Sequence, residues 1–370
     1  MKIAMYNLTT TTKLGGIETF NWGIAKSLAE RGHIVHIYGG KGDFREDVPK
    51  GVSIFTFPFV RQKFIPNLGS RFRKFAERLS FGLTSFAALF KGRYDLIYVH
   101  KPYDLLTALL LSKLRGARVV FGSGGTEFFS GYGWLVRRVD HFFACSEFNA
   151  KQIEKYCGVK PAILPNGINT ELFRPIGPDL HLRKSILQIS DEEKVIISAC
   201  RLVGWKGLDY SIKAISELLK KGTPVRYLII GDGEDRERLQ LLAVELDIAD
   251  NVTFLGSIKN SGLVVYYSIA DVAVFPSIAN ETFGISIAEA MACGVPVVST
   301  DVGGIPGVVA EDTGLLVTAR RVDELTLAIE VLLNDEPKAE SFGRAARERI
   351  VENFSWDIIA EKFVRYINNA

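Results

Sequence analysis

Two glutamates, Glu281 and Glu289, lie eight positions apart in the segment NETFGISIAEAMACGVP, residues 280–296. The segment is mostly apolar, and neither Lys nor Arg occurs from 260 to 319. A buried carboxylate without donors or a counter-charge costs several kcal/mol in effective terms, so both acids need partners from elsewhere in the chain or from a ligand. Eight helical residues advance about 80° beyond two full turns, so the two acids cannot share one helical face. We therefore expect two separate roles.

The segment between the two acids predicts a helix over 284–293, ended by Gly294 and Pro296. Glu281 then lies just before the helix, beside its positive N-terminal end, and Glu289 lies inside it among alanines and a methionine. A vicinal diol can donate two O–H bonds to one such carboxylate. The alternative for Glu289 is a structural role, with hydrogen bonds from backbone amides.

Two cations follow a strand-like run in ACRLVGWKGLD, residues 199–209. Arg201 comes directly after the apolar run that ends at Ala199, and Lys206 lies five residues further on. Ligands of open parallel sheets bind outside the carboxyl ends of the strands, and Arg and Lys suit phosphate there. An ordinary surface loop with two solvated cations is the alternative.

A glycine pair occurs in KLGGIETF, residues 13–20, after the first strand-like run. Gly15 and Gly16 allow a close backbone approach, and the following helix start offers free N–H groups to an anion. A tight turn without a ligand explains the same residues. The pattern is not GxGxxG, and no acidic residue ends the second strand, so a dinucleotide site is not supported.

Phosphate-binding cations and diol-binding carboxylates together describe a nucleoside diphosphate joined to a sugar. The chain has no Walker loop and no Asp-x-Asp cluster in a suitable position. We therefore expect no metal ion and no cofactor, the nucleotide sugar being a substrate.

Short apolar runs alternate with amphipathic segments along the whole chain, which is typical of βαβ units and parallel sheets. Predicted helices include 21–31, 209–221, 236–246 and 322–334. A stretch rich in Pro, Gly and Asn over 164–180 marks the boundary between two similar α/β domains. We place the first domain at 1–175 and the second at 176–354.

The composition is that of an ordinary globular protein, with 47% hydrophobic and 24% charged residues and a net charge of +3. This balance gives no indication of a nucleic-acid partner. The four cysteines show no CxxC spacing, which argues against a zinc site or a disulfide framework. The first residues lack the apolar core of a signal peptide, and we expect a cytoplasmic protein.

These motifs resemble the retaining family 4 glycosyltransferases, whose GT-B fold has two Rossmann-like doubly wound domains facing a central cleft. The resemblance spans nearly the whole chain. It rests on GGIE, CSEFNAKQI, LPNGINTELFRP, RLVGWKG, VRYLIIGDGEDRERL, NVTFLGSI and the run VFPSIANETFGISIAEAMACGVPVVSTDVGGIPGVV. The most specific part is the pair of glutamates with Phe-Gly between them.

The resemblance implies a hexosyltransferase that moves a sugar from a UDP- or GDP-linked donor to a glycan or lipid-linked acceptor. It implies that Arg201 and Lys206 hold the diphosphate and offset charge on the leaving group. It also implies that Glu281 contacts the donor sugar and Glu289 the ribose hydroxyls. In such a fold the first domain binds the acceptor, the second binds the donor, and the helix over 355–370 packs back on the first.

Further donor contacts follow by position from the same resemblance. They are the loop glycine Gly16, the backbone amides of Phe283, Gly284 and Ile285, and Ser257 and Ile258 near the base.

One position departs from the family pattern. Many members carry a histidine after the strand that corresponds to ARVVF, and here Gly124 stands in its place. Either this subgroup works without that group, or a neighbour such as Ser123, Thr126 or Glu127 substitutes, or transferase activity is weak or lost. We expect His100 and Glu127 to face the acceptor side. A nucleotide-sugar binding protein and a GT-B epimerase stay open as alternatives.

The segment over 61–83 combines six basic residues and one acidic residue within 61–78 with interleaved phenylalanines and leucines. A basic amphipathic helix of this kind is consistent with contact to an anionic membrane surface, at the inner face of the cell membrane. The alternative is a solvated helix whose aromatic face lies in the core.

Overall fold

The computed structural model describes residues 1–13, 15–42, 48–125, 128–279 and 281–369. The chain forms two compact units, Met1–Gly167 with Trp356–Ala370, and Ile168–Ser355, and each is described here by itself. The sequence placed the division after residue 175. Residues just after Gly167 lie with the second unit because Arg347 donates to the carbonyl oxygens of Thr170 and Phe173, at 3.1 and 2.7 Å.

The first unit is built on a seven-stranded sheet in the order β3-β2-β1-β4-β5-β6-β7, and all its strand pairs are parallel. Its strands are β1 Lys2–Tyr6, β2 Ile34–Gly40, β3 Val52–Phe57, β4 Leu96–Val99, β5 Arg118–Ser123, β6 His141–Ala144 and β7 Ala162–Ile163. Its helices are α1 Gly16–Glu30, α2 Ser70–Gly92, α3 Leu105–Arg115, α4 Tyr132–Val136, α5 Glu147–Cys157 and the terminal α13 Trp356–Asn368.

The second unit repeats the plan with six parallel strands in the order β10-β9-β8-β11-β12-β13. Its strands are β8 Lys194–Ala199, β9 Val225–Ile230, β10 Val252–Gly256, β11 Val272–Phe275, β12 Val297–Thr300 and β13 Gly314–Val317. Its helices are α6 Leu208–Lys220, α7 Arg236–Glu245, α8 Asn260–Tyr267, α9 Ile285–Ala292, α10 Ile305–Val308, α11 Val322–Asn334 and α12 Glu336–Phe354.

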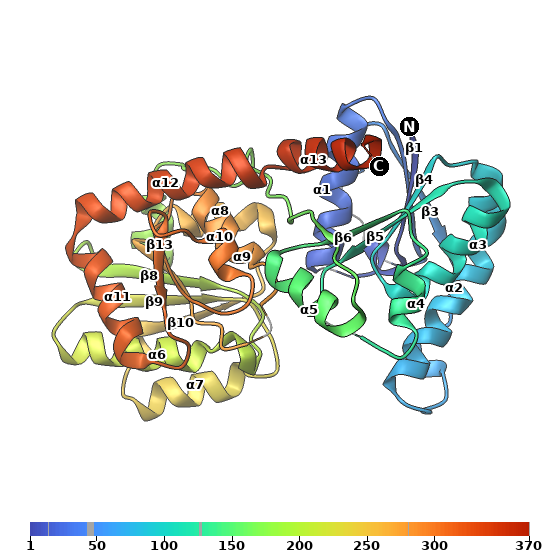
Figure 1. Ribbon diagram of the computed structural model, residues 1–370. Helices are drawn as coiled ribbons and strands as arrows, with labels where there is room; N and C mark the ends of the chain where they lie inside the picture. Colours follow the sequence, from blue (N-terminus) through green and yellow to red (C-terminus); the bar gives the residue numbers. More distant parts are fainter. Residues whose placement is uncertain (14, 43–47, 126–127, 280, 370) are drawn as a thin grey trace. The chain divides into compact units, whose positions relative to one another are not determined.

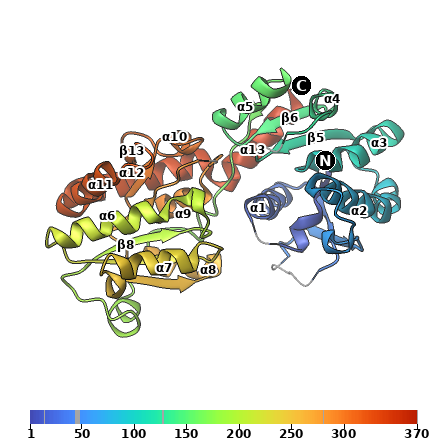
Figure 2. The ribbon, with the colours of Figure 1, turned by 90° about the horizontal axis from the view of Figure 1, so that it is seen from below.

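Each sheet is covered by helices on both faces, and Figure 1 shows this three-layer arrangement within each unit. In the second unit α6 and α7 lie over one face of the sheet (Figure 2), and α9 lies over the other. Parallel strands joined by crossover helices require this, because central strands such as β4, β11 and β12 are buried on both sides. The predicted α/β fold class is confirmed.

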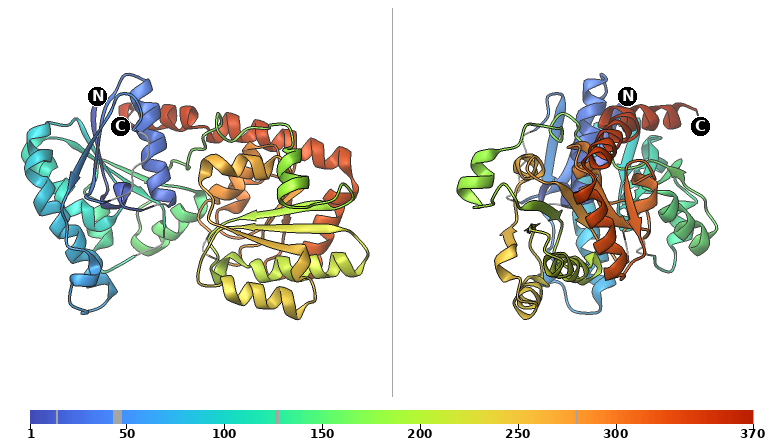
Figure 3. Two further views of the ribbon diagram at one scale, coloured as in Figure 1. Left: turned by 180° about the vertical axis from the view of Figure 1, so that it is seen from behind. Right: turned by 90° about the vertical axis from the view of Figure 1, so that its left-hand side faces the viewer.

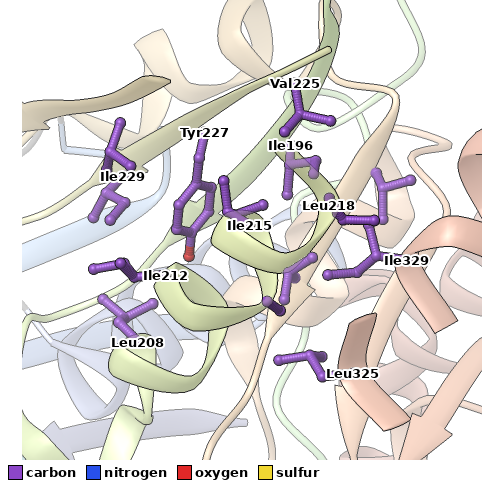
Figure 4. Close-up of a cluster of buried hydrophobic side chains, with 14 of the residues drawn as sticks. Ile196, Leu208, Ile212, Ile215, Leu218, Val225, Tyr227, Ile229, Leu325 and Ile329 are labelled. Carbon is purple, nitrogen blue, oxygen red and sulfur yellow. The ribbon is translucent and has the colours of Figure 1, made fainter. Parts of the chain in front are cut away.

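Buried aliphatic side chains fill the space between the β8–β9 strands and α6 (Figure 4). Ile196 and Tyr227 come from the sheet, and Ile212, Ile215 and Leu218 come from α6, all fully buried. The spacing of these α6 residues by three is the helical period predicted from the amphipathic pattern. This core fixes β8, and with it the start of the loop that carries Arg201 and Lys206.

The terminal helix α13 lies beside α1 in the first unit (Figures 1 and 3). Trp356 sits where Gly23 and Gly167 leave room for its ring, since a Cβ at either glycine would lie 1.9 or 2.3 Å from ring carbons. Ile359 and Phe363 of α13 are fully buried, and a buried side chain of this size contributes about 1.5–3 kcal/mol.

No helix among the described residues is both long and apolar enough to cross a bilayer.

Candidate active site

The loop after β8 holds Lys206 in a fixed position. Lys206 ends a single 3-10 turn, Gly204–Lys206, and Gly207 follows with φ +69°. A Cβ at Gly207 would lie 2.1 Å from the carbonyl oxygen of Pro276, which follows β11. Only glycine therefore allows the loop after β8 to lie against the loop after the neighbouring strand.

The loop after β11 brings Glu281 to Lys206. The amide of Ile278 donates to the carbonyl oxygen of Trp205 at 2.9 Å, and the Lys206 ammonium makes an ion pair with the Glu281 carboxylate. The Trp205 ring centroid lies 4.5 Å from the same ammonium. Both charged side chains are mostly buried, with 18% of Lys206 and 11% of Glu281 exposed.

The loop after β12 fixes the main chain of Glu281. The amide of Gly304 donates to the Glu281 carbonyl oxygen at 2.9 Å. Gly303 has φ +64°, and a Cβ there would lie 2.0 Å from the same oxygen. Three loops at the carboxyl ends of neighbouring strands β8, β11 and β12 thus meet at Glu281.

The local sequence left open whether the partners of Glu281 come from elsewhere in the chain or from a ligand, and the absence of nearby cations favoured ligand hydroxyls. In the structure Lys206 itself is the counter-charge of Glu281. The two residues are 75 positions apart, so a window of local sequence could not reveal the pair.

The predicted helix after Glu281 is present as α9, one residue shorter at each end than expected and preceded by Gly284 at φ +93°. The Phe283 ring packs edge-on against Phe354, with centroids 5.6 Å apart, and is 3% exposed. Phe283 and Gly284 therefore offer main-chain groups to a ligand. The first-turn N–H groups of α9, including that of Ile285, have no intrahelical acceptor.

Glu289 is buried inside the second unit, as its apolar neighbours in sequence indicated. Burial raises the pKa of its carboxyl to about 8. Among the described residues, its hydrogen-bond partner is the Asn260 side-chain amide, whose nitrogen lies 3.5 Å from Oε1. The carboxyl thus lacks the backbone-amide bonds that a structural role would predict, and it has unused acceptor capacity for hydroxyl groups.

Asn260 also places the loop after β10 next to Glu289. Ser257 and Ile258 lie between β10 and α8, two or three residues before Asn260. The contact from Asn260 to Glu289 spans 29 positions. The predicted base-binding residues and the predicted ribose-binding residue are thus on neighbouring elements, whereas Asn260 itself was not predicted.

Two family models match the chain. "Glycosyltransferase Family 4" matches residues 14–172, and "Glycosyl transferases group 1" matches residues 182–349. A GDP-mannose-dependent monoacylated alpha-(1-6)-phosphatidylinositol monomannoside mannosyltransferase of Corynebacterium glutamicum is 30% identical over 70% of this chain and 67% of its own length. The chain belongs to the family 4 glycosyltransferases. The predicted family and enzyme class, a hexosyltransferase, are confirmed.

Solved structures support the fold of this glycosyltransferase. Sucrose-phosphate synthase from Thermosynechococcus elongatus superposes with a TM-score of 0.84 at 23% identity, over 99% of this chain and 98% of that one. Anabaena HepE in complex with UDP and glucose gives a TM-score of 0.78 at 21% identity, over the full length of both chains. The GT-B architecture expected from the sequence is confirmed.

His100 follows β4 in the first unit of the glycosyltransferase. Its Nδ1–H donates a hydrogen bond to the Gly122 carbonyl oxygen at 2.9 Å, so that Nε2 is the unprotonated nitrogen of the neutral ring. The ring packs edge-on against Phe20 and Tyr98, and burial lowers its pKa to about 3. The imidazole is neutral and mostly enclosed, and its expected role near the acceptor stays a prediction.

Gly124, which stands in place of the family histidine, has space for a side chain. A Cβ there would meet Ile17 Cγ1 at 3.8 Å, an ordinary contact. Ser123 and Asn149 both donate to the Gly125 carbonyl oxygen, at 3.1 and 2.9 Å, and fix the loop. Glu127, the second expected acceptor-side residue, and Thr126 lie outside the described residues.

Gly16 begins α1 in the first unit, as the GGIE motif predicted. Glu18, one turn into the helix, is buried and bonds to the Thr9 hydroxyl. The glutamate of the motif thus ties the helix start to the Thr-rich turn after β1. The expected contact of Gly16 with phosphate stays a prediction.

The segment over 61–83 has features of both alternatives, the exposed amphipathic helix and the helix with an aromatic face in the core. Phe81 is fully buried and stacks on Tyr6 at 4.9 Å, so it belongs to the core. Arg78, counted among the basic residues of a surface face, is buried and pairs with Asp104 at 2.6 Å. Phe72 remains exposed on the same helix.

The Arg78 pair was missed by the sequence analysis. Arg78 also donates to Asn7 Oδ1 at 3.0 Å, and burial raises the pKa of Asp104 to about 6. Arg78 and its two partners come from three separate elements of the chain. The one indication of these contacts in the sequence is the position of the arginine on the core-facing side of its helix.

Proposed function

We propose that this glycosyltransferase transfers a hexose from a nucleoside diphosphate sugar to a glycan or lipid-linked acceptor, with retention of anomeric configuration and without a metal ion. The observation that carries the proposal is the meeting of Lys206, Glu281 and the start of α9 at one edge of the second sheet, with Glu289 in the same helix. Cations, free amides and carboxylates are the groups that a sugar diphosphate requires.

In the proposed reaction the bond between the anomeric carbon and the phosphate oxygen breaks, and a bond to the acceptor oxygen forms as that hydroxyl passes its proton to the departing diphosphate. Negative charge grows on the leaving diphosphate. Lys206 and the exposed Arg201, whose guanidinium has no ion-pair partner among the described residues, are positioned to offset that charge. These two cations take the part that a divalent ion plays elsewhere, which supports metal independence.

The relatives guide the choice of donor. The Corynebacterium relative is named as dependent on GDP-mannose, and HepE is solved with UDP and glucose. We therefore test UDP-glucose, UDP-galactose and GDP-mannose with a lipid extract as acceptor. Transfer that persists in EDTA is expected, and proton NMR of the new anomeric signal reports the configuration. An inverted product, or transfer that requires added metal, would refute that part of the proposal.

Gly124 supports a second candidate, a nucleotide-sugar binding protein with weak or lost transferase activity. Donor binding without transfer or hydrolysis for any donor would favour it, and a sugar epimer as product would favour an epimerase. A Gly124→His variant sharpens the choice, because the site has room for a Cβ and the fold should tolerate it. If that variant alone transfers sugar, the wild-type protein is a binding protein.

We also propose a peripheral position at the cytoplasmic face of a membrane, through what we call the α2–α3 surface. Its apolar side chains are 41–73% exposed and are Phe64, Leu68, Phe72, Leu79 and Leu83 on or before α2, and Leu106, Leu110 and Leu114 on α3. The two helices are neighbours, since Arg115 lies 3.6 Å from the Phe90 ring centroid and a Cβ at Gly82 would lie 2.5 Å from Thr107 Oγ1. Exposed basic residues accompany them, namely Arg61, Lys63, Arg71, Lys91, Lys113 and Arg115.

Vesicle flotation tests this surface. The triple variant Phe64→Ser, Leu68→Ser, Phe72→Ser should lose binding to vesicles of phosphatidylglycerol and phosphatidylcholine, and salt should weaken the wild-type binding. The matched control is Leu241→Ser with Val244→Ser on α7, where both side chains are 63% exposed. Equal flotation of the wild type and the triple variant would remove the α2–α3 surface from the proposal.

A further inference from the structure

The ion pair between Lys206 and Glu281 is held by the backbone of the surrounding loops. The loop of Lys206 is tied to the loop after β11 by the Ile278 amide, and the main chain of Glu281 is tied to Gly304. Trp205 packs against the lysine ammonium. The two charges therefore face each other because three loops fix them there.

This arrangement creates a conflict with the diphosphate of a donor. A phosphate bound to Lys206 has the Glu281 carboxylate as its close neighbour. Two negative charges at close range repel each other in this mostly buried site, whereas the isolated pair of Lys206 and Glu281 is neutral overall. The carboxylate lowers the affinity of the site for phosphate unless something donates hydrogen bonds to it.

A sugar attached to the diphosphate is such a donor. Its hydroxyls lie next to the terminal phosphate and can donate to the Glu281 carboxylate, which accepts two or more bonds. A free nucleoside diphosphate has no hydroxyl at that end. Its terminal phosphate carries an additional ionisable oxygen with a pKa of about 6, so it is also more negative at neutral pH.

We propose that Glu281 discriminates the intact nucleotide sugar from the nucleoside diphosphate product, by repelling a terminal phosphate that has lost its sugar. This inference rests on the proposed function. After transfer, the carboxylate pairs with Lys206 again and favours release of the product. Glu281 is in this respect a specificity-determining residue as well as a contact of the donor sugar.

The test is calorimetric titration of the purified full-length protein with UDP, GDP and ADP, and with UMP, GMP and AMP. Glu281→Gln removes the charge and keeps the shape, and Glu281→Asp keeps the charge. The control is Glu311→Gln, at an exposed position in the same unit, which changes the net charge by the same amount at a different position. Thermal unfolding of each variant verifies that the fold is retained.

Glu281→Gln should bind the preferred nucleoside diphosphate about tenfold tighter or more than the wild type does, since about 1.4 kcal/mol of relieved repulsion corresponds to tenfold. Glu281→Gln should bind the monophosphates with wild-type affinity. Glu281→Asp and Glu311→Gln should bind the nucleoside diphosphate with wild-type affinity. The intact nucleotide sugar should gain nothing from Glu281→Gln.

Diphosphate affinity that is equal or weaker in Glu281→Gln, with the fold retained, overturns the inference and leaves the proposed function standing. If Glu281→Gln does not fold, Glu281→Ala takes its place in the comparison and must show the same gain in affinity for the nucleoside diphosphate. Failure of every diphosphate to bind any variant overturns the proposed function, and the inference with it.

Discussion

Replacing Glu289 by Gln should make the protein more stable, and increasingly so as the pH rises. The glutamate is 5% exposed, and burial raises the pKa of its carboxyl to about 8 from an ordinary value of 4.5. The folded state therefore keeps a proton that the unfolded chain releases above about pH 4.5. The free energy of unfolding falls as the pH rises from about 4.5 to about 8 and changes little from this group beyond that.

The size of the effect follows from these two pKa values. A difference of 3.5 pKa units corresponds to about 5 kcal/mol in full. Between pH 5.5 and pH 9 the wild type should lose about 3 kcal/mol that the Gln variant, which cannot ionise, keeps. For a unit of this size 1 kcal/mol shifts the melting temperature by about 2–4 °C, so the gap between the variants should widen by roughly 10 °C.

The assay is differential scanning calorimetry of the wild type and Glu289→Gln at pH 5.5, 7 and 9. The control is Glu352→Gln, an exposed carboxylate in the same unit, whose difference from the wild type should not depend on pH. A gap between Glu289→Gln and the wild type that stays constant from pH 5.5 to 9 would show that Glu289 ionises normally in the folded state. It would thereby refute the account of this site.

Three further predictions concern single side chains. Lys206→Ala should reduce transfer by at least about a hundredfold, as the loss of a leaving-group contact predicts, and should lower the melting temperature because Glu281 loses its counter-charge; wild-type turnover would contradict the assignment. Gly303→Ala should impair transfer, because its Cβ would lie 2.0 Å from the Glu281 carbonyl oxygen, whereas Gly307→Ala, with nothing within 4 Å, should not; activity assays at matched concentration compare them. Arg78→Met leaves a buried carboxylate without its counter-charge, and denaturant unfolding should record a loss of about 3–5 kcal/mol.

Elements that depend on local pattern could be predicted from the sequence. The helix expected over 322–334 is α11 with the same bounds, and the helix expected over 209–221 is α6, shifted by one residue. The amphipathic segment over 21–31 lies in α1, and this helix begins at Gly16, where the glycine pair indicated a helix start. Apolar periodicity decides such elements, and sequence shows it directly.

Contacts between distant positions could not be predicted. Glu281 and Lys206 meet because adjacent strands β8 and β11 end at the same edge of a sheet, although 75 residues separate them. Arg78 and Asp104 are brought together by the packing of α2 near the start of α3. Composition and periodicity predict which face of an element is buried, but the pairing of charges requires the register of the sheet.

The two glutamates that first drew attention satisfy their charges in opposite ways, and this difference has consequences for binding. Glu281 has a counter-charge within the fold, so a donor must replace an existing contact, and its affinity carries that cost. Glu289 has the Asn260 side-chain amide as its hydrogen-bond partner among the described residues, and burial keeps its carboxyl protonated near neutral pH. The ionised carboxylate accepts more hydroxyl hydrogen bonds than the protonated carboxyl does, and accepts them more strongly, so we expect donor affinity in the wild type to increase with pH up to about 8 and to stay level above it. Titrations with the preferred nucleoside diphosphate from pH 6 to 9 measure this affinity. An affinity that does not depend on pH would show that Glu289 does not bind the ribose.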